Sequence, residues 1–187
     1  MIQQHQTSLH IGAVFLSFPK EIHERAKHCI NKRFFTQKRL ILGKVNFMSE
    51  RFIGTWKLVS YENRSGDQVT YPVGKNHVGY IMYNDDGYMA VALMASNRRR
   101  FSSMDIMGGT TEEIVAAYGT YLSYCGKYAV TEDKVIHHVE VSSYPNWIGQ
   151  DQVRFYKFEG NKLILSTPFM ILGGKQQRGY LIWERMK

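Results

Sequence analysis

The sequence is poor in cysteine and has no long hydrophobic run, and each shortage excludes a class of protein. Two cysteines, Cys29 and Cys125, are too few for a disulfide framework or a cysteine metal site, and they favour reduced thiols in the cytoplasm. The apolar run at residues 11–18 is too short to cross a bilayer, and no Lys or Arg precedes it as in a signal peptide. We therefore predict a cytoplasmic protein without a transmembrane segment.

Common catalytic motifs are also missing. There is no Gly-x-Ser-x-Gly elbow, Walker loop, His-Glu-x-x-His helix or glycine-rich dinucleotide loop. His137 and His138 are adjacent in a predicted strand, so their side chains point to opposite faces and make a poor metal pair. We expect neither a metal ion nor a cofactor.

Positive charge is concentrated at the N-terminus. Of the net charge of +8, residues 1–47 supply +6, from eight Lys and Arg against two Glu, and the remainder supplies +2. A nucleic-acid-binding domain would carry its basic residues on the folded surface, so no nucleic-acid partner is expected. The run Arg98, Arg99, Arg100 is more typical of a solvated loop than of a phosphate site.

The chain divides into an N-terminal extension, residues 1–47, and a folded domain, residues 48–187. The extension is either disordered or a basic amphipathic helix. Three interpretations remain open for it: sequence upstream of a natural start at Met48, a membrane-surface or targeting helix, or an ordered packing arm.

The domain is organised as short strands separated by turns. We predict strands at residues 52–62, 77–84, 87–96, 125–131, 134–142, 151–159, 161–167 and 178–186. The pair Asp86-Gly87 is the strongest hairpin signal. One helix is predicted at residues 110–125, capped by Thr110 or Thr111, with Glu112 and Glu113 in its first turn.

Eight antiparallel strands are enough to close a barrel whose interior holds one small ligand. A sandwich is the competing all-β architecture, because a count of strands does not separate the two.

Four segments carry a family resemblance: "FIGTWKLVSYE" (52–62), "VGYIMYNDDGYMAVALM" (78–94), "HHVEVSSYPNWIGQDQVRFY" (137–156) and "LIWERM" (181–186). In this order they resemble the lipocalin-like domain family, small uncharacterised proteins of bacteria and fungi. The resemblance implies an eight-stranded antiparallel barrel of the calycin type. It further implies that Gly54 and Trp56 form a signature on the first strand, with Trp56 closing one end and Arg185 or Arg178 lying across its ring.

Strand alternation predicts which side chains face inward. On residues 134–142 the apolar face holds Val135, His137, Val139 and Val141, so His137 points inward and His138 outward. On residues 151–159 the face with Gln152 and Arg154 points inward, because Asp151 and Lys157 favour water. Lys127 likewise turns the Tyr124 and Tyr128 face inward. The predicted pocket therefore contains Tyr124, Tyr128, His137, Gln152 and Arg154.

Burying the Arg154 charge requires a partner. A ligand carbonyl or carboxylate is one candidate, and Glu62, Glu140 or Asp151 is the alternative. Trp147, in the loop between these strands, either covers the pocket mouth or packs the end of the barrel.

Three functions follow from this pocket. The first is binding of a small, largely apolar molecule that carries a carbonyl or carboxylate. The second is a cofactor-free isomerase or cyclase, with His137 or a tyrosine such as Tyr128 as general acid or base and Arg154 stabilising negative charge. The third is a structural or interaction module with a filled barrel.

Overall fold

The structure, a computed structural model, describes residues 47–187. The interpretations offered for the N-terminal extension therefore lie outside the described residues, except at Phe47, and so does Cys29. Among the described residues, no helix has the length and hydropathy needed to cross a membrane.

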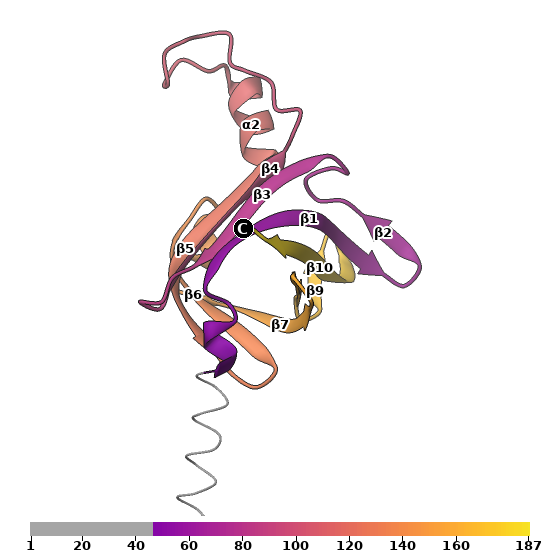
Figure 1. The fold of residues 1–187 in the computed structure, drawn as a ribbon. Helices are drawn as coiled ribbons and strands as arrows, with labels where there is room; N and C mark the ends of the chain where they lie inside the picture. Colours follow the sequence, from indigo (N-terminus) through magenta and orange to yellow (C-terminus); the bar gives the residue numbers. More distant parts are fainter. Residues whose placement is uncertain (1–46) are drawn as a thin grey trace, which may run out of the picture. The chain divides into compact units, whose positions relative to one another are not determined.

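An antiparallel barrel forms the body of this domain (Figure 1). Its strands are β1 (Gly54–Ser65), β3 (His77–Tyr83), β4 (Tyr88–Ala95), β5 (Tyr121–Val130), β6 (Lys134–Ser142), β7 (Asp151–Glu159), β8 (Lys162–Ser166) and β10 (Lys175–Arg185). Neighbours pair in this order, and β10 pairs back onto β1 from Trp56↔Arg185 to Arg64↔Arg178. This last pairing removes the free edges, so the predicted barrel is confirmed over the sandwich.

Two short strands were not predicted. They are β2 (Gln68–Thr70), which pairs with the end of β1, and β9 (Met170–Leu172), which pairs with the start of β10. Three residues give too short a pattern for alternation to be recognised.

The turn between β3 and β4 confirms the hairpin predicted from Asp86-Gly87. The N–H of Asn84 donates to the carbonyl of Tyr88 at 2.8 Å, and Gly87 has a φ of +87°, which strongly favours glycine.

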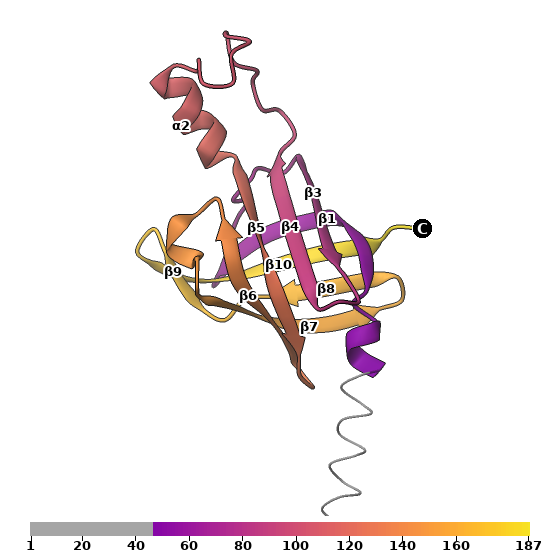
Figure 2. The same ribbon diagram turned by 90° about the vertical axis from the view of Figure 1, so that its left-hand side faces the viewer.

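Helix α2 (Thr111–Gly119) begins as predicted but ends earlier. Thr110 caps it, and Glu113 completes a capping box by accepting from the Thr110 N–H. The helix was predicted to continue to residue 125, which is wrong, because Tyr121 and the residues after it pair with β4 as β5. The helix and the loop before it project from the rim of the barrel, and no helix residue is buried (Figure 2).

A bulge in β6 corrects one inward assignment. Cys125 pairs with Val141 and Gly126 with Val139, so Glu140 is an extra residue and the alternation reverses after it. Val139 is buried, but Val141 is 62 % exposed, so placing Val141 on the inward face was wrong.

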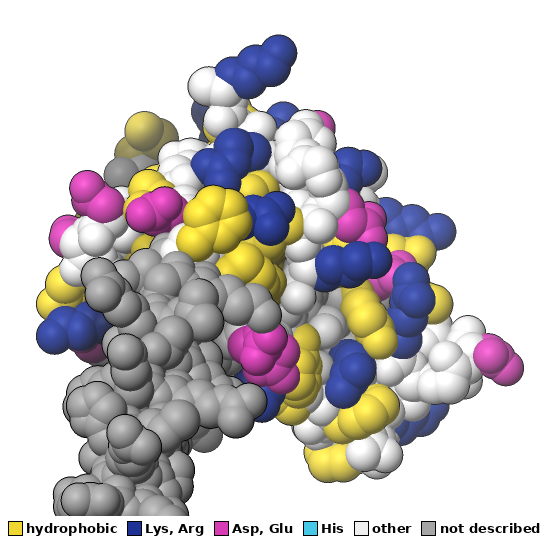
Figure 3. Space-filling model, turned by 60° about the horizontal axis from the view of Figure 1, so that its bottom comes forward, with side chains coloured by type: hydrophobic (Ala, Val, Ile, Leu, Met, Phe, Trp, Pro, Cys, Tyr) yellow, Lys and Arg dark blue, Asp and Glu magenta, His cyan; other side chains and the backbone are white. Residues whose placement is uncertain are grey.

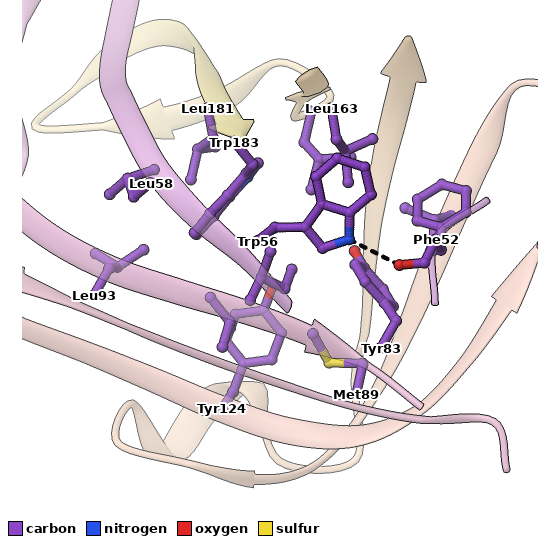
Figure 4. Packing of buried hydrophobic residues seen from close by; sticks show 14 of the residues in the cluster. Phe52, Trp56, Leu58, Tyr83, Met89, Leu93, Tyr124, Leu163, Leu181 and Trp183 are labelled. Atoms are coloured by element: carbon purple, nitrogen blue, oxygen red, sulfur yellow. Dashed lines mark hydrogen bonds between the residues drawn. The ribbon is translucent and has the colours of Figure 1, made fainter. Parts of the chain in front are cut away.

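One end of the barrel is closed by an aromatic cluster. The indole N–H of Trp56 donates to the carbonyl of Phe52 at 2.8 Å (Figure 4). The guanidinium of Arg185 lies over the Trp56 ring, 4.1 Å from its centroid, and donates to the carbonyls of Ile53 and Arg51. These contacts tie the first strand to the last.

Gly54 allows this close approach. Its φ is +125°, and a Cβ there would lie only 3.0 Å from Nη1 of Arg185. Arg178, the other basic residue considered for this position, instead lies over the ring of Phe169 at 4.4 Å.

The outer surface carries mixed charge. On the face shown in Figure 3, Lys and Arg side chains are interspersed with acidic, apolar and uncharged ones where the grey residues leave it visible. This agrees with the nearly balanced composition of residues 48–187.

Candidate functional site

The barrel interior contains a cavity of about 100 Å³ toward the end opposite Trp56. Apolar side chains make up most of its wall, including Leu93, Leu122, Trp147, Met170, Leu172 and Leu181. Arg154 and the hydroxyl-bearing Tyr61, Tyr124 and Thr167 also line it. The cavity is thus an apolar space with a few polar groups at its wall, the usual composition of a small-molecule site.

Arg154 brings a positive charge into this wall. Its side chain is only 7 % exposed. The other buried polar residues of the described region are Asn63, Thr167 and His137, and His137 is uncharged at neutral pH for the reasons given below. Nη1 donates to the carbonyl of Val153 at 2.8 Å, and both terminal nitrogens lie 3.4–3.5 Å from Oε1 of Gln152. These oxygens are neutral, so the protein leaves the charge uncompensated.

The acidic residues predicted as alternative partners for Arg154 lie elsewhere. Glu62 pairs with Arg64, and Asp151 lies 2.6 Å from Nδ1 of His138. Glu140 is exposed at the bulge. Within the described part of the chain, no carboxylate pairs with Arg154.

A bulge in β1 explains why Glu62 misses the interior. The pairing with β10 shifts between Leu58 and Ser60, so alternation counted from Trp56 reverses beyond this point. Tyr61 consequently turns inward to the cavity, and Glu62 turns away from it.

His137 is buried between two tyrosines. The hydroxyl of Tyr83 lies 2.8 Å from its Nε2, and the hydroxyl of Tyr124 lies 2.9 Å from its Nδ1. Burial, and then the positive charges of Arg154 and His138, hold the pKa of His137 well below its usual value. Burial also raises the pKa of Tyr83 and Tyr124. At neutral pH all three side chains are therefore uncharged.

The structure brings together most of the predicted pocket. Tyr124 and Arg154 line the cavity, His137 lies behind the Tyr124 hydroxyl, and Gln152 is the register partner of His137. Tyr128 does not reach the cavity, because its hydroxyl donates to the carbonyl of Asn84 in the β3–β4 turn at 2.9 Å.

Trp147 forms part of the cavity wall at the open end. It ends the short helix η1 (Pro145–Trp147), and its ring packs edge-on against Tyr124 and Tyr144, with centroids 5.5 and 5.7 Å apart. A large flat side chain on a short loop thus covers one side of the cavity.

Sequence reasoning missed Tyr83 and Tyr61. Tyr83 lies on a strand with apolar side chains on both faces, Tyr80 and Met82 on one and Ile81 and Tyr83 on the other, so alternation gave no direction. Alternation counted from Trp56 placed Tyr61 on the outward face, because the count did not include the bulge before it. The inward direction of Tyr61 can be assigned only once its pairing with Leu181 on β10 is known.

Two comparisons with known proteins found a match to this chain. The family model described as a lipocalin-like domain matches residues 53–186. The 4'-hydroxy-3'-methoxypropiophenone carrier protein of Aspergillus oryzae (strain ATCC 42149 / RIB 40) is 36 % identical over 107 residues, which cover 52 % of this chain and 96 % of the relative. No solved structure matches the chain.

Proposed function

The chain belongs to the lipocalin-like domain family, and we propose that it binds a small, largely apolar molecule whose carbonyl or carboxylate oxygen contacts Arg154. One observation carries this proposal: a buried guanidinium lines an apolar cavity and has only neutral oxygens as partners. A ligand oxygen would supply the missing compensation, because hydrogen bonds to a charged donor are the stronger ones.

The name of the Aspergillus relative suggests the chemical class. A propiophenone is an aromatic ketone, which combines a flat apolar ring with one carbonyl oxygen. That combination fits a cavity with an apolar wall and a cation, so we propose an aryl ketone or aryl carboxylate as the ligand here.

For such a ligand to enter, side chains at the end of the barrel opposite Trp56 must move. The cavity holds about 100 Å³, whereas a cavity that accommodates benzene measures about 150 Å³. Trp147, at the end of the three-residue helix η1, and β9, a three-residue strand that pairs with β10, border it. We therefore propose that Trp147 swings outward when the ligand enters.

A second function is favoured by the contact between Tyr124 and His137. Tyr124 connects the cavity to a neutral imidazole at 2.9 Å, which is the arrangement that an acid/base catalyst uses. With Arg154 stabilising an enolate, the same pocket would serve a cofactor-free isomerase acting next to a ketone.

Binding can be tested by titration calorimetry and native mass spectrometry with 4'-hydroxy-3'-methoxypropiophenone and its analogue with a methylene in place of the ketone. Arg154→Gln should weaken ketone binding about tenfold or more. Arg64→Gln, which removes an exposed guanidinium paired with Glu62, is the matched control and should bind like the wild type. Equal affinities of the wild type and Arg154→Gln would refute the role of Arg154.

Two further results decide between the alternatives. Failure of the folded wild type to bind the ketone or the corresponding carboxylate would favour a filled barrel. Protein-dependent exchange of the ketone α-protons in D₂O, followed by NMR, would favour the isomerase.

A further inference from the structure

We infer that Tyr124 directs its hydroxyl hydrogen into the cavity, so that the site recognises a ligand oxygen able to accept two hydrogen bonds, one from Tyr124 and one from Arg154. This inference rests on the proposed function and specifies the group that the site selects, the oxygen of a ketone or a carboxylate.

The reasoning begins with the two nitrogens of His137. A neutral imidazole has one N–H donor and one acceptor nitrogen. Nε2 faces the Tyr83 hydroxyl and Nδ1 faces the Tyr124 hydroxyl, at 2.8 and 2.9 Å. Two arrangements are therefore open, with the proton on Nδ1 or on Nε2.

Tyr83 decides between them. Its side chain is 1 % exposed, and Nε2 of His137 is the one hydrogen-bond partner of its hydroxyl within the described residues. If Nε2 carried the proton, the Tyr83 hydroxyl would accept that hydrogen and its own would have no acceptor. Either tautomer leaves one tyrosine hydrogen without an acceptor in the described protein, and an unsatisfied buried donor costs more than a typical hydrogen bond gains. A ligand oxygen can remove this cost only at Tyr124, because Tyr124 lines the cavity and Tyr83 does not. Tyr83 therefore donates to Nε2, and the proton lies on Nδ1.

The direction of the second bond follows. Nδ1–H donates to the Tyr124 oxygen, so the Tyr124 hydrogen does not point to His137. Within the described region, Tyr124 has no other hydrogen-bond acceptor, and its side chain lines the cavity. Tyr124 and Arg154 both line this small cavity, so the two donors face the same space. The charge of the Arg154 guanidinium also counteracts the rise that burial causes in the Tyr124 pKa.

Unpaired buried groups of both kinds, donors and acceptors, occur in the domain, but the acceptor among them, Oδ1 of Asn63, does not line the cavity. The indole N–H of Trp183, another residue of the cavity wall, is buried and has no acceptor among the described residues. Such a wall favours a ligand with accepting oxygens. A ketone or carboxylate oxygen has the two lone pairs needed to accept from Tyr124 and Arg154 at once.

The tautomer can be measured without a ligand. In ¹⁵N-labelled protein, long-range ¹H–¹⁵N correlation spectra distinguish protonated from unprotonated ring nitrogens, and His137→Gln assigns the signals. We expect Nδ1 to be protonated and Nε2 unprotonated. Protonation of Nε2 would overturn the inference, whether or not a ligand binds.

Selectivity provides the second test, again with the aryl ketone and its methylene analogue. Tyr124→Phe should weaken ketone binding about three- to tenfold and leave the methylene analogue unchanged. Tyr128→Phe is the matched control, because its hydroxyl bonds to Asn84 outside the cavity; it should keep the wild-type preference for the ketone.

The outcomes separate the two proposals. If the wild type binds the ketone and Tyr124→Phe retains the full preference, the inference fails and the proposed function stands. If the wild type binds neither ketone nor carboxylate, the proposed function fails and the inferred selectivity fails with it, whatever the tautomer.

Discussion

The hydroxyl oxygen of Tyr83 lies 2.8 Å from Nε2 of His137, although the two residues are 54 positions apart. The bond crosses the barrel interior from β3 to β6, with β4 and β5 between them in the sheet. This bond fixes the imidazole of His137, which in turn contacts the hydroxyl of Tyr124. Tyr83 thus orients a hydroxyl in the cavity wall without lining the cavity itself.

Stability should depend on pH through His137. Its folded pKa lies below the unfolded value of about 6.5, so between these values the unfolded chain binds more protons. The contribution of His137 to the free energy of unfolding is therefore fully present above about pH 6.5. It is lost as the pH falls below this value, by up to about 1.4 kcal/mol per pH unit. Urea unfolding at pH 7.5 and pH 5 should show a smaller fall for His137→Gln than for the wild type.

The control for this experiment is His138→Gln, at an exposed histidine paired with Asp151. It removes only the smallest of the three causes that lower the His137 pKa and leaves burial and Arg154 in place, so it should retain most of the wild-type fall. An identical fall in His137→Gln and the wild type would mean that other groups account for the pH dependence.

Arg185→Met should destabilise the barrel by about 3 kcal/mol. The change removes the cation over Trp56 and leaves the carbonyls of Ile53 and Arg51 without their donor. Arg64→Met, an exposed arginine over the Tyr180 ring at 4.9 Å, should cost less than about 0.5 kcal/mol. Equilibrium urea unfolding measures both, and equal small losses would contradict a closing role for Arg185.

Gly126→Ala should be among the most damaging single-methyl additions in the domain. A Cβ at this position would lie 2.0 Å from the carbonyl oxygen of His138 and 2.9 Å from the N of Glu140, so β5 and β6 would have to separate at the bulge. We expect a loss of about 3 kcal/mol or more in the free energy of unfolding.

Gly119→Ala provides the comparison, because no atom lies within 4 Å of its added Cβ. It should be neutral or stabilise the helix by up to about 1 kcal/mol. Similar melting temperatures for the two variants would show that β5 and β6 tolerate the displacement.

Trp147→Ala should change ligand kinetics more than protein stability. With the indole gone from the cavity wall and from the face of Tyr124, association and dissociation of an aryl ketone should both accelerate, with the larger effect on dissociation. Stopped-flow fluorescence measures both rates, using Trp56 and Trp183 as the remaining probes. Ile148→Ala, at an exposed neighbour, should leave both rates unchanged.

Features set by neighbouring residues were predictable from the sequence. The hairpin at Asp86-Gly87 and the cap at Thr110 each depend on a few consecutive residues, and both are found where they were expected. The inward direction of Arg154 was also predictable, because Asp151 and Lys157 on the same strand favour water.

Features set by strand pairing were not predictable. A bulge is an extra residue only in relation to the partner strand, so the shifts near Leu58 and at Glu140 leave no mark on the single strand. They determine that Tyr61 faces the cavity and that Glu62 and Val141 do not. The first of these shifts also removes Glu62 as a partner for Arg154.

The cluster beneath Arg185 and Trp56 implies that the two ends of the barrel open on different timescales. Backbone amides exchange with solvent fastest where few buried contacts oppose local opening. The amides of β9 and of the loop carrying Trp147 should therefore exchange well before those around Trp56, which are held by an aromatic cluster and two arginine–carbonyl bonds. Ligand exchange would then follow a fluctuation confined to one rim, at a rate independent of global unfolding.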